Sequence, residues 1–473
     1  MKICLILEGS YPYVHGGVSS WTHQYISELS EHQFVLWLIG AKAEDRGKFV
    51  YQLPANVTEV HEVFLDDALR LSSSRKKIAR FTDEEFQTLK ALLNCQQPDW
   101  DILFDLFQTR RLDPMAFLQS NRFLSILTDL CLEKYPYTPF SSCFHTIRSM
   151  LLPVLYILGT EVPEADVYHA IATGYAGVLA AMGSYIRKRP LLLTEHGIYT
   201  REREEELIRA QWVVPEFKSR WIRFFYMLSD AVYSRAQIVT SLFSRARETQ
   251  IEMGCLPERC RVIANGIHFD RFSAIPPKPE DGWVDIGAVV RIAPIKDLIT
   301  MIYAFFELKS RMPNVRLHIL GGVDDPEYDQ ECRDLAAHLG VQDLIFTGRV
   351  DVVSYMEKLD FTVLTSISEG QPLSVLESLA AGRPCVTTDV GCCRELLDGE
   401  GDDPYGLAGY HVPPMRRDLL ADALENMCRS RERRLMMGEN GRKRVAAYYT
   451  NAQMIENYRQ MYREVEENGG NRI

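Results

Sequence analysis

Short apolar runs alternate with amphipathic segments along much of the chain. The runs Ile3–Leu7, Phe34–Ile39 and Thr58–Phe64 combine β-branched and aromatic residues as buried strands do, and Ser19–Leu29 has the apolar spacing of a helix. The same alternation returns near residue 165 and again from Val284 onward. Strands that alternate with helices are typical of parallel sheets covered by helices. The sequence therefore predicts an α/β protein built on doubly wound parallel sheets.

Two segments interrupt this alternation and divide the chain. Residues 66–158 are helical in pattern, with helix-start signals at Thr82 and at Asp113-Pro114. We interpret them as an insertion in the first domain, either a packed helical layer or a surface for an acceptor chain or partner. Ile275–Gly282 is rich in proline and charge, as linkers are. We therefore expect a first domain at 1–275, a second at 283–450, and an amphipathic C-terminal helix at about 451–473.

Composition is that of a globular protein and excludes some partners. Of the 473 residues, 46% are hydrophobic and 25% are charged, which suffices for two domains with separate cores. The net charge of -11 argues against nucleic acid, whose binding needs a basic face, so any anion site must be local. The eleven cysteines are scattered, without a paired Cys-x-x-Cys or a His-rich spacing, so we expect free thiols and no metal site.

The first residues do not resemble a targeting signal. The apolar run at the N-terminus meets Glu8 after five residues, which is too short for a signal peptide. No uncharged run in the sequence approaches the ~18 residues of a membrane span. We therefore expect a cytoplasmic protein that is neither secreted nor membrane-spanning.

The stretch Ser368–Glu377 carries a candidate phosphate site. It joins the apolar run Phe361–Leu364, a predicted strand, to a helix predicted over Leu373–Ala381, with Gly370 and Pro372 at the corner between them. Proline suits the first turn of a helix, where its missing N–H costs nothing. The free amides of such a turn attract phosphate. Here they are the amides of Leu373, Ser374 and Val375.

Two carboxylates flank this helix start. Glu369 lies in the loop before the amides, and Glu377 lies two turns further on. On either side of a bound diphosphate, one carboxylate could bind a sugar and the other a ribose. Taken alone, the two residues are as readily a solvated loop acid and an ordinary helix acid.

Arg291 and Lys296 are candidate ligands of the same diphosphate. Arg291 ends the first strand of the second domain, and Lys296 lies in the loop before a helix that Asp297 should cap. When the bond between a sugar and a diphosphate breaks, negative charge grows on the leaving oxygen, and cationic donors stabilise it. Without their neighbours, both would be ordinary surface residues.

The first domain offers candidates after three of its strands. Gly16 and Gly17 follow the first strand and leave backbone bare for the approach of a ligand. His169 and His196 each end a strand, and ligands of parallel sheets lie beyond the carboxyl ends of strands. Either histidine could instead be structural. Arg201–Glu206 has the mixed charges of a solvated helix face and is assigned no role.

Taken together, these motifs resemble those of the retaining glycosyltransferases of family four (GT4). Glu369 and Glu377, followed by Ser378–Thr388, Gly391 and Glu395, are similar to the family signature.

The resemblance extends to both halves of the chain. Val290–Lys296 is similar to the family's Gly-Arg-x-x-x-x-Lys, although Val290 and Asp297 stand where the family has glycine. Thr194–Gly197 matches its Thr-x-His-Gly. Glu8–Trp21 is similar to the loop of those members that extend Pel-type exopolysaccharides.

The resemblance implies a fold, a reaction and partners. The fold is GT-B, in which two Rossmann-like domains face each other across a cleft, with residues 1–275 on the acceptor side and 283–450 on the donor side. The C-terminal helix would pack back onto the first domain. The reaction is transfer of a sugar from a UDP-sugar to a growing exopolysaccharide, by front-face attack without a covalent intermediate. The partners are the UDP-sugar, a carbohydrate acceptor and a membrane-bound polysaccharide export complex.

The resemblance also implies roles for individual residues. The expected catalytic residues are His196, Arg291, Lys296 and Glu369. Those expected to contact the donor are Gly16, Gly17, Arg291, Lys296, Glu369, Leu373, Ser374, Val375 and Glu377.

No metal and no cofactor are expected. The sequence contains no Asp-x-Asp, the motif that holds a divalent metal on a leaving diphosphate. Asp324-Asp325 and Asp402-Asp403 lie in loop-like sequence and are expected to be solvated.

Two other functions compete with this one. A non-catalytic nucleotide-sugar sensor would keep the same residues, and donor hydrolysis would distinguish it from an enzyme. A dinucleotide-dependent oxidoreductase needs Gly-x-Gly-x-x-Gly after a strand, which His15-Gly16-Gly17 does not supply.

Overall fold

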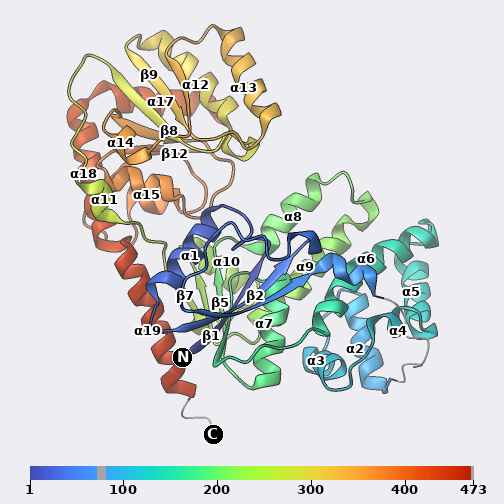
Figure 1. The fold of residues 1–473 in the computed structure, drawn as a ribbon. Helices are drawn as coiled ribbons and strands as arrows, with labels where there is room; N and C mark the ends of the chain where they lie inside the picture. The colour runs from blue at the N-terminus through green and yellow to red at the C-terminus, as the bar shows by residue number, and fades with distance from the viewer. Residues whose placement is uncertain (72–80, 470–473) are drawn as a thin grey trace. The chain divides into compact units, whose positions relative to one another are not determined.

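The computed structural model describes residues 1–71 and 81–469, which divide into two units (Figure 1). Unit 1 comprises Met1–Ser241, Arg247–Val262 and the chain from Arg459 onward, and unit 2 comprises Leu242–Ala246 and Ile263–Tyr458. Each unit contains one parallel sheet with helices packed against it and a hydrophobic core of its own. The predicted α/β fold class, with two domains built on parallel sheets, is therefore confirmed.

Unit 1 is built on a seven-stranded parallel sheet. The strand order is β3-β2-β1-β4-β5-β6-β7, so β1 and β4 are neighbours and the order reverses between them. Most strands are nearly continuous apolar runs, as in sheets that are covered on both faces. They are β1 (Lys2–Glu8), β2 (Gln33–Gly40), β3 (Val57–Phe64), β4 (Val167–Ala170), β5 (Leu191–Glu195), β6 (Ile238–Ser241) and β7 (Cys260–Val262).

The chain between β3 and β4 forms a group of helices beside the sheet of unit 1 (Figure 1). Thr82 caps the helix Asp83–Leu93 with a capping box, and Asp113 caps the helix Pro114–Leu118, as the sequence predicts. Residues 72–80 of the expected insertion lie outside the described residues. The helices of unit 1 are α1 (Gly17–Glu28), α2 (Asp83–Leu93), α3 (Trp100–Gln108), α4 (Pro114–Leu118), α5 (Asn121–Lys134), α6 (Phe140–Leu158), α7 (Gly174–Arg187), α8 (Tyr199–Arg209), α9 (Pro215–Tyr233) and most of α10 (Ser244–Glu252).

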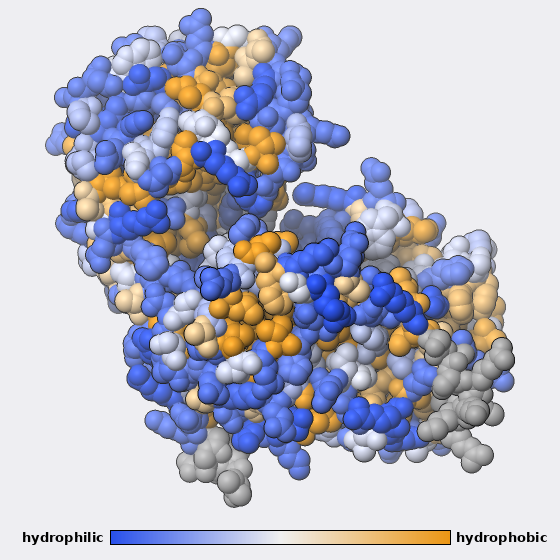
Figure 2. All heavy atoms as spheres, in the orientation of Figure 1, coloured by the Kyte–Doolittle hydropathy of each residue, from blue (hydrophilic) through white to orange (hydrophobic). Residues whose placement is uncertain are grey.

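Helix α6 is long and apolar enough to cross a membrane by length and composition. It is the one helix in the described part of the chain that passes this test. Its apolar side chains, among them Ile147, Leu151 and Leu155, are buried in the core of unit 1. The outer surfaces of the units in Figure 2 are mostly hydrophilic, with smaller hydrophobic patches. We therefore describe α6 as a core helix.

The C-terminal helix α19 (Asn451–Gly469) is shared by both units, and its residues from Arg459 group with unit 1. There the hydroxyl of Tyr462 lies 2.6 Å from the hydroxyl of Tyr25 and 2.6 Å from Nδ1 of His169. These bonds tie the end of the chain to α1 and β4. Residues 470–473 of the expected helix lie outside the described residues.

Unit 2 is built on a six-stranded parallel sheet with the order β10-β9-β8-β11-β12-β13. The order reverses between β8 and β11, which pair directly. The strands are β8 (Val284–Val289), β9 (Val315–Leu320), β10 (Leu344–Gly348), β11 (Phe361–Leu364), β12 (Cys385–Thr388) and β13 (Gly409–Val412). The helices are α11 (Phe269–Ser273), α12 (Leu298–Arg311), α13 (Pro326–Leu339), α14 (Val352–Met356), α15 (Leu373–Ala380), α16 (Cys393–Asp398), α17 (Arg417–Arg429) and α18 (Arg431–Tyr448).

Helix α18 contains two glycines in its interior, Gly438 and Gly441. A Cβ on Gly438 would lie 2.0 Å from the backbone oxygen of Gly382, and one on Gly441 would lie 2.6 Å from Cδ2 of Leu379. These glycines therefore allow α18 to pack closely on α15 and do not mark a helix end.

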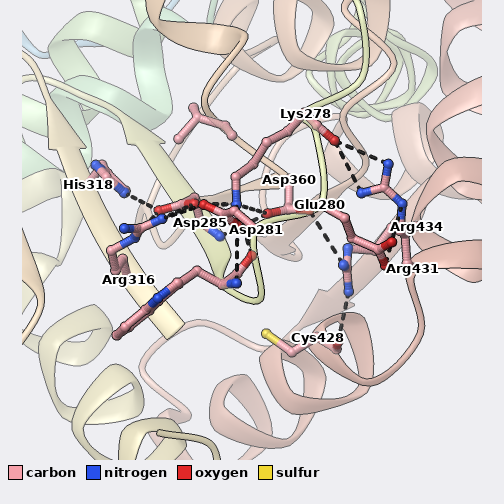
Figure 3. A network of polar contacts seen from close by, with 12 residues as sticks. Lys278, Glu280, Asp281, Asp285, Arg316, His318, Asp360, Cys428, Arg431 and Arg434 are labelled. Carbon is pink, nitrogen blue, oxygen red and sulfur yellow. Dashed lines mark hydrogen bonds and ion pairs between the residues drawn. The ribbon is translucent and has the colours of Figure 1, made fainter. Parts of the chain in front are cut away.

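A network of charged side chains fixes the proline-rich segment Ile275–Gly282 within unit 2 (Figure 3). The ammonium of Lys278, 8% exposed, lies 2.8 Å from Asp281, 2.5 Å from Asp285 and 3.2 Å from Asp360. Although burial raises the pKa of Asp285, hydrogen bonds from Lys278 and from two side chains of β9 hold it well below its usual value. Residues 275–282 belong to unit 2, whereas the sequence pattern places a domain boundary there.

Candidate active site

In unit 2, the loops after β8 and β11 meet where the strand order reverses. Ligands of parallel α/β sheets bind at such a point. The N–H of Ile367 donates to the oxygen of Ile295 at 2.9 Å, and the hydroxyl of Thr365 donates to the oxygen of Lys296 at 2.8 Å. The two loops are therefore held together, and they carry Lys296 and Glu369.

Lys296 and Glu369 form an ion pair at this point. The two charged groups lie 2.5 Å apart, and their side chains are only 17% and 14% exposed. The hydroxyl of Ser366 also donates to Glu369 at 2.5 Å. The structure thus brings two of the predicted site residues together. In place of each other, the ammonium can bind a phosphate and the carboxylate can accept hydrogen bonds from sugar hydroxyls.

The N-terminus of α15 follows Glu369 and has no side-chain cap among the described residues. Pro372 is the N-cap and not the first helical residue, and its oxygen accepts a bond from the N–H of Val375 at 3.1 Å. The prediction of a free amide at Val375 is therefore wrong, because the helix opens with a tight i to i+3 bond. Leu373 and Ser374 occupy the first helical positions, where amides have no intrahelical partner.

Gly391 supports the loop that carries Glu369. Its φ of +55° is left-handed, and a Cβ there would lie 2.1 Å from the oxygen of Gly370 and 2.4 Å from that of Glu369. The N–H of Cys392 donates to the oxygen of Gly370 at 3.0 Å. Because a larger residue would displace this backbone, Gly391 fixes the position of Glu369.

Glu377 lies on α15 and is partly buried. Burial raises its pKa to about 7, against the opposing charge of Arg271. Arg271 belongs to α11, which packs against α15, and no motif in the sequence points to it. A carboxyl group that ionises near neutral pH can accept bonds from ribose hydroxyls in its charged form.

Arg291 is largely exposed and forms an ion pair with Asp324. The expectation that Asp324 is simply solvated is therefore wrong, because its N–H donates to the oxygen of Ile292 and so places it beside Arg291. Among the described residues, no hydrogen bond or ion pair joins Arg291 to Lys296 or Glu369.

Asp403 is another acid for which the expectation of solvation is wrong. It pairs with Arg444, and their side chains are only 4% and 1% exposed. The bond at 2.8 Å joins α18 to the loop before β13.

Asp297 shows how this chain tolerates a departure from the family pattern. Its backbone is left-handed, with φ 46° and ψ 54°, and its side chain caps α12 by accepting a bond from the N–H of Thr300 at 3.2 Å. The predicted cap is confirmed. Aspartate adopts this conformation more readily than most residues, so it can replace a glycine here.

In unit 1, the loops after β1, β4 and β5 line a cavity of about 280 Å³, which we call the switch-point cavity. It lies where the strand order of this sheet reverses. Its walls include Glu8, Ser10, Ile171, His196, Tyr199 and Arg203.

Glu8 is the last residue of β1 and lies at the N-terminus of α7. Its carboxyl group accepts bonds from the N–H of Ala176 at 3.2 Å and from the hydroxyl of Tyr199 at 3.0 Å. Tyr199 fits there because Gly174 has no side chain; a Cβ would lie 2.4 Å from Cζ of the ring. Burial raises the pKa of Glu8, and Arg203 acts against this rise. The anion position at this helix end is therefore filled by the protein's own carboxyl group.

His196 follows β5 and lines the switch-point cavity. Its ring packs edge-on against Trp21, with centroids 4.4 Å apart. Burial lowers the pKa of His196 to about 4, so the imidazole is neutral at physiological pH. Among the described residues, its Nε2 has no hydrogen-bond partner. A neutral ring of this kind can donate to or accept from a hydroxyl group of a ligand.

His169 does not face a ligand site, so that expectation is wrong. The ring is fully buried, with Nδ1 2.6 Å from the hydroxyl of Tyr462 and Nε2 2.9 Å from that of Thr194. His169 precedes the last residue of β4 and points into the interior, which explains its structural role.

Gly16 and Gly17 lie at the start of α1 and are exposed, with Gly16 as the N-cap. A Cβ added at either position would meet no described atom within 4 Å. The fold of unit 1 therefore does not require glycine at these two positions. Glycine would be required by a ligand that approaches the backbone there.

Sequence reasoning missed Glu202 and Arg203, which line the switch-point cavity. Arg201–Glu206 has the pattern of a solvated helix face, yet Arg203 stacks 5.1 Å from the ring of Tyr199 and lines the cavity. The position of this segment in the sequence indicates its role. Helix α8 starts directly after the strand that leads to His196, so it begins at the carboxyl edge of the sheet.

These two arrangements define a class of protein. Two parallel-sheet domains of this kind match the fold of the GT-B glycosyltransferases. The second domain carries a cation, a carboxylate and an open helix N-terminus at its switch point.

Comparison with known families gives the same class. Residues 1–258, more than half of the chain, match the family described as "Domain of unknown function (DUF3492)", and residues 270–444 match "Glycosyl transferases group 1". The chain belongs to the first family, and residues 270–444 match the group 1 domain, so the protein is a glycosyltransferase. This assignment overturns the oxidoreductase alternative.

Individual relatives are distant. The chain is 24% identical over 336 residues to the MMP alpha-(1->4)-mannosyltransferase of Mycolicibacterium hassiacum, covering 69% of this chain and 76% of the relative. It is 26% identical over 305 residues to the capsular polysaccharide biosynthesis glycosyltransferase CapM of Staphylococcus aureus, covering 61% and 74%. The crystal structure of Anabaena HepE in complex with UDP matches with a TM-score of 0.61 at 15% identity over 98% and 100% of the two chains, which shows the fold alone.

Proposed function

We propose that this enzyme is a retaining glycosyltransferase that transfers a sugar from a UDP-sugar to a growing exopolysaccharide, in the manner of PelF in Pel polysaccharide synthesis. The ion pair of Lys296 and Glu369 beside the open N-terminus of α15 carries the proposal. HepE has been solved with UDP and with UDP-glucose, which supports the donor class. The name of CapM and the similarity of Glu8–Trp21 to Pel-type enzymes support the acceptor class.

On the donor side, Lys296 and Arg291 leave their carboxylate partners and contact the diphosphate, together with the amides of Leu373 and Ser374. As the bond between the anomeric carbon and the phosphate oxygen breaks, charge grows on that oxygen and Lys296 stabilises it. Glu369 then accepts bonds from hydroxyls of the transferred sugar. Glu377 accepts bonds from the ribose.

On the acceptor side, the acceptor hydroxyl attacks from the face that the diphosphate leaves. The leaving phosphate oxygen takes the proton of that hydroxyl, and no covalent intermediate forms. His196 is neutral and orients the acceptor or the sugar by a hydrogen bond. Gly16 and Gly17 allow the ligand to approach the backbone. We place the reaction in the cytoplasm, beside a membrane-bound polysaccharide export complex.

A thermal-melt assay with UDP, GDP and ADP added separately tests the donor assignment. UDP should raise the melting temperature most, and equal shifts with all three nucleotides would contradict a UDP-specific donor site. Hydrolysis or transfer of a UDP-sugar, followed with purified protein, then excludes the alternative of a non-catalytic sensor.

A further inference from the structure

The helices inserted between β3 and β4 form a second cavity in unit 1, with a volume of about 530 Å³. We call it the insertion cavity; its walls include Trp37, His61, Phe107, Arg111, Tyr156 and Glu161. Its volume lies within the ~300–1,000 Å³ typical of ligand pockets. None of its lining residues belongs to the switch-point cavity.

Two covered aromatic side chains close the base of the insertion cavity, and its rim is polar. Trp37 of β2 and Phe107 of α3 are 0% and 1% exposed and belong to the core of unit 1. Arg111 and Glu161 are exposed, and Tyr156 is partly buried between the floor and the rim. This combination of an apolar base with a few hydrogen-bonding groups is typical of sites for small organic ligands.

Arg111 is held in an unusual conformation at the cavity wall. Its φ of +54° is left-handed, a region that glycine usually occupies. Among the described residues, its guanidinium forms no hydrogen bond and no ion pair, whereas the neighbouring Arg110 pairs with Glu85. Non-glycine residues held in such backbone conformations are concentrated at functional sites.

The charges of the cavity favour an uncharged ligand. Arg111 and Glu161 are of opposite sign, and the carboxylate of Glu62, also at the wall, is already bound by the hydroxyl of Tyr13 at 2.6 Å and the N–H of Gly47 at 2.9 Å. A phosphate or nucleotide would need an excess of cations. A sugar ring can pack its apolar face on the partly buried ring of Tyr156 and direct its hydroxyls to a mixed rim of donors and acceptors.

We propose that the insertion cavity is a second carbohydrate subsite, which binds a neutral segment of the glycan away from its reactive end. The inference rests on the proposed function, and it gives the insertion the task of retaining the growing chain between transfers. The bond between Tyr13 and Glu62 joins the cavity wall to the loop that carries Gly16 and Gly17.

The double variant Arg111→Gly/Glu161→Gln tests this subsite. Glycine keeps the left-handed backbone while removing the guanidinium, so the variant should fold. Arg122→Gln is a matched control, because Arg122 is an exposed arginine of the insertion that does not line the cavity. The probes are neutral hexasaccharides of glucose, galactose and N-acetylglucosamine and the corresponding monosaccharides, titrated into the full chain by calorimetry.

We expect at least one hexasaccharide to bind the wild type and the control, and the double variant to bind it about tenfold more weakly or worse, which is the effect of losing hydrogen bonds to charged groups. UDP affinity should not change. In transfer assays, the KM for long acceptors should rise in the double variant while kcat and the KM for short acceptors stay the same.

Two outcomes would overturn the subsite: no hexasaccharide binds the wild type, or the double variant binds and elongates long acceptors as the wild type does. The subsite would also be overturned if the wild type bound lipid vesicles and no glycan, and the double variant lost that binding. The cavity would then hold an acyl chain. Failure of the proposed function is distinguishable. The wild type would then show no UDP-sugar turnover, while a hexasaccharide would still bind the wild type and bind the double variant more weakly.

Discussion

The switch points of the two units have the same topology and opposite chemistry. In both sheets the order reverses between the first and fourth strands of the unit, and the loops after these strands carry the polar residues. In unit 2 these loops carry Lys296 and Glu369 beside an α15 N-terminus without a side-chain cap. In unit 1 the carboxyl group of Glu8 occupies the N-terminus of α7.

This difference shows what the sheet determines and what the loops determine. The parallel sheet supplies a location and a helix N-terminus in both units. The residue that ends the first strand then decides whether that helix end remains open to a foreign anion. In unit 1 the site is already occupied by a carboxyl group and suits an uncharged, hydroxyl-rich ligand, whereas in unit 2 it suits a diphosphate.

Lys296→Ala should have the largest effect and tests the anion site of unit 2. Losing a donor to a developing anion typically costs about 2.7–4 kcal/mol, or ~10²–10³ in rate. We expect turnover at saturating donor to fall by this factor, and UDP-sugar affinity measured by calorimetry to change much less.

Arg291→Lys is the companion variant, because it keeps the charge but loses the planar two-pronged geometry and should remain impaired. If Lys296→Ala weakened binding and left saturated turnover unchanged, Lys296 would only anchor the donor, and the leaving-group role would be wrong.

The two glutamates of unit 2 should separate ribose from sugar. Removing a hydrogen bond to a charged group costs ~1.5–3 kcal/mol, roughly ten- to hundredfold in affinity. Glu377→Ala should weaken UDP and UDP-sugar alike, whereas Glu369→Ala should weaken UDP-sugar binding or turnover and leave UDP nearly unchanged. Calorimetry with both ligands decides, and identical losses of UDP affinity in the two variants would refute the assignment.

His196→Ala tests the acceptor role of unit 1. Loss of a single neutral hydrogen bond should reduce transfer by about tenfold, because such bonds contribute ~0.5–1.5 kcal/mol. The thermal shift caused by UDP should persist, since the donor residues lie in unit 2. Transfer at the wild-type rate would assign His196 a structural role, like that of His169.

The pKa of Glu377 predicts a smaller, pH-dependent effect. With a pKa of about 7 in the free enzyme, the ionised fraction rises with pH, and UDP affinity should rise by up to roughly tenfold from pH 6 to pH 8. Glu377→Gln should remove this part of the dependence and leave that of the phosphate itself.

Stability should change in the opposite sense. The folded-state pKa of Glu377 is above the ordinary value, so the protonated form favours the fold, and this contribution is lost as pH rises from about 4.5 to about 7. Denaturant unfolding should therefore show the wild type losing stability relative to Glu377→Gln over that range. A constant difference between the two would contradict the shifted pKa.

The sequence predicts the parts of this comparison that depend on local pattern. The apolar runs of β1, β8 and β11 and the corner before α15 are visible because each is continuous in sequence. By contrast, β12 and β13 mix polar and apolar residues over their short lengths and show no continuous apolar run.

Contacts between distant segments account for what sequence reasoning missed at the sites. The partners of Arg291, Glu377 and Glu8 are Asp324, Arg271 and Tyr199, each on a different element from the residue that it affects. The free amide predicted at Val375 is wrong for a local reason, because α15 opens with an i to i+3 bond from Val375 to Pro372 that the sequence pattern does not show.

Metal removal should have the smallest effect of all. If Lys296, Arg291 and the helix end of unit 2 stabilise the leaving diphosphate, transfer in excess EDTA should equal that in magnesium. The sequence has no Asp-x-Asp, and among the described residues no three His, Cys, Asp or Glu side chains are grouped closely enough to hold a metal. Adding magnesium to Lys296→Ala should therefore not restore turnover, because no carboxylate pair would hold the ion where the ammonium was. Complete loss of wild-type activity in EDTA, restored by magnesium or manganese, would contradict this prediction. It would mean that Lys296 and Arg291 do not stabilise the leaving diphosphate without a metal ion.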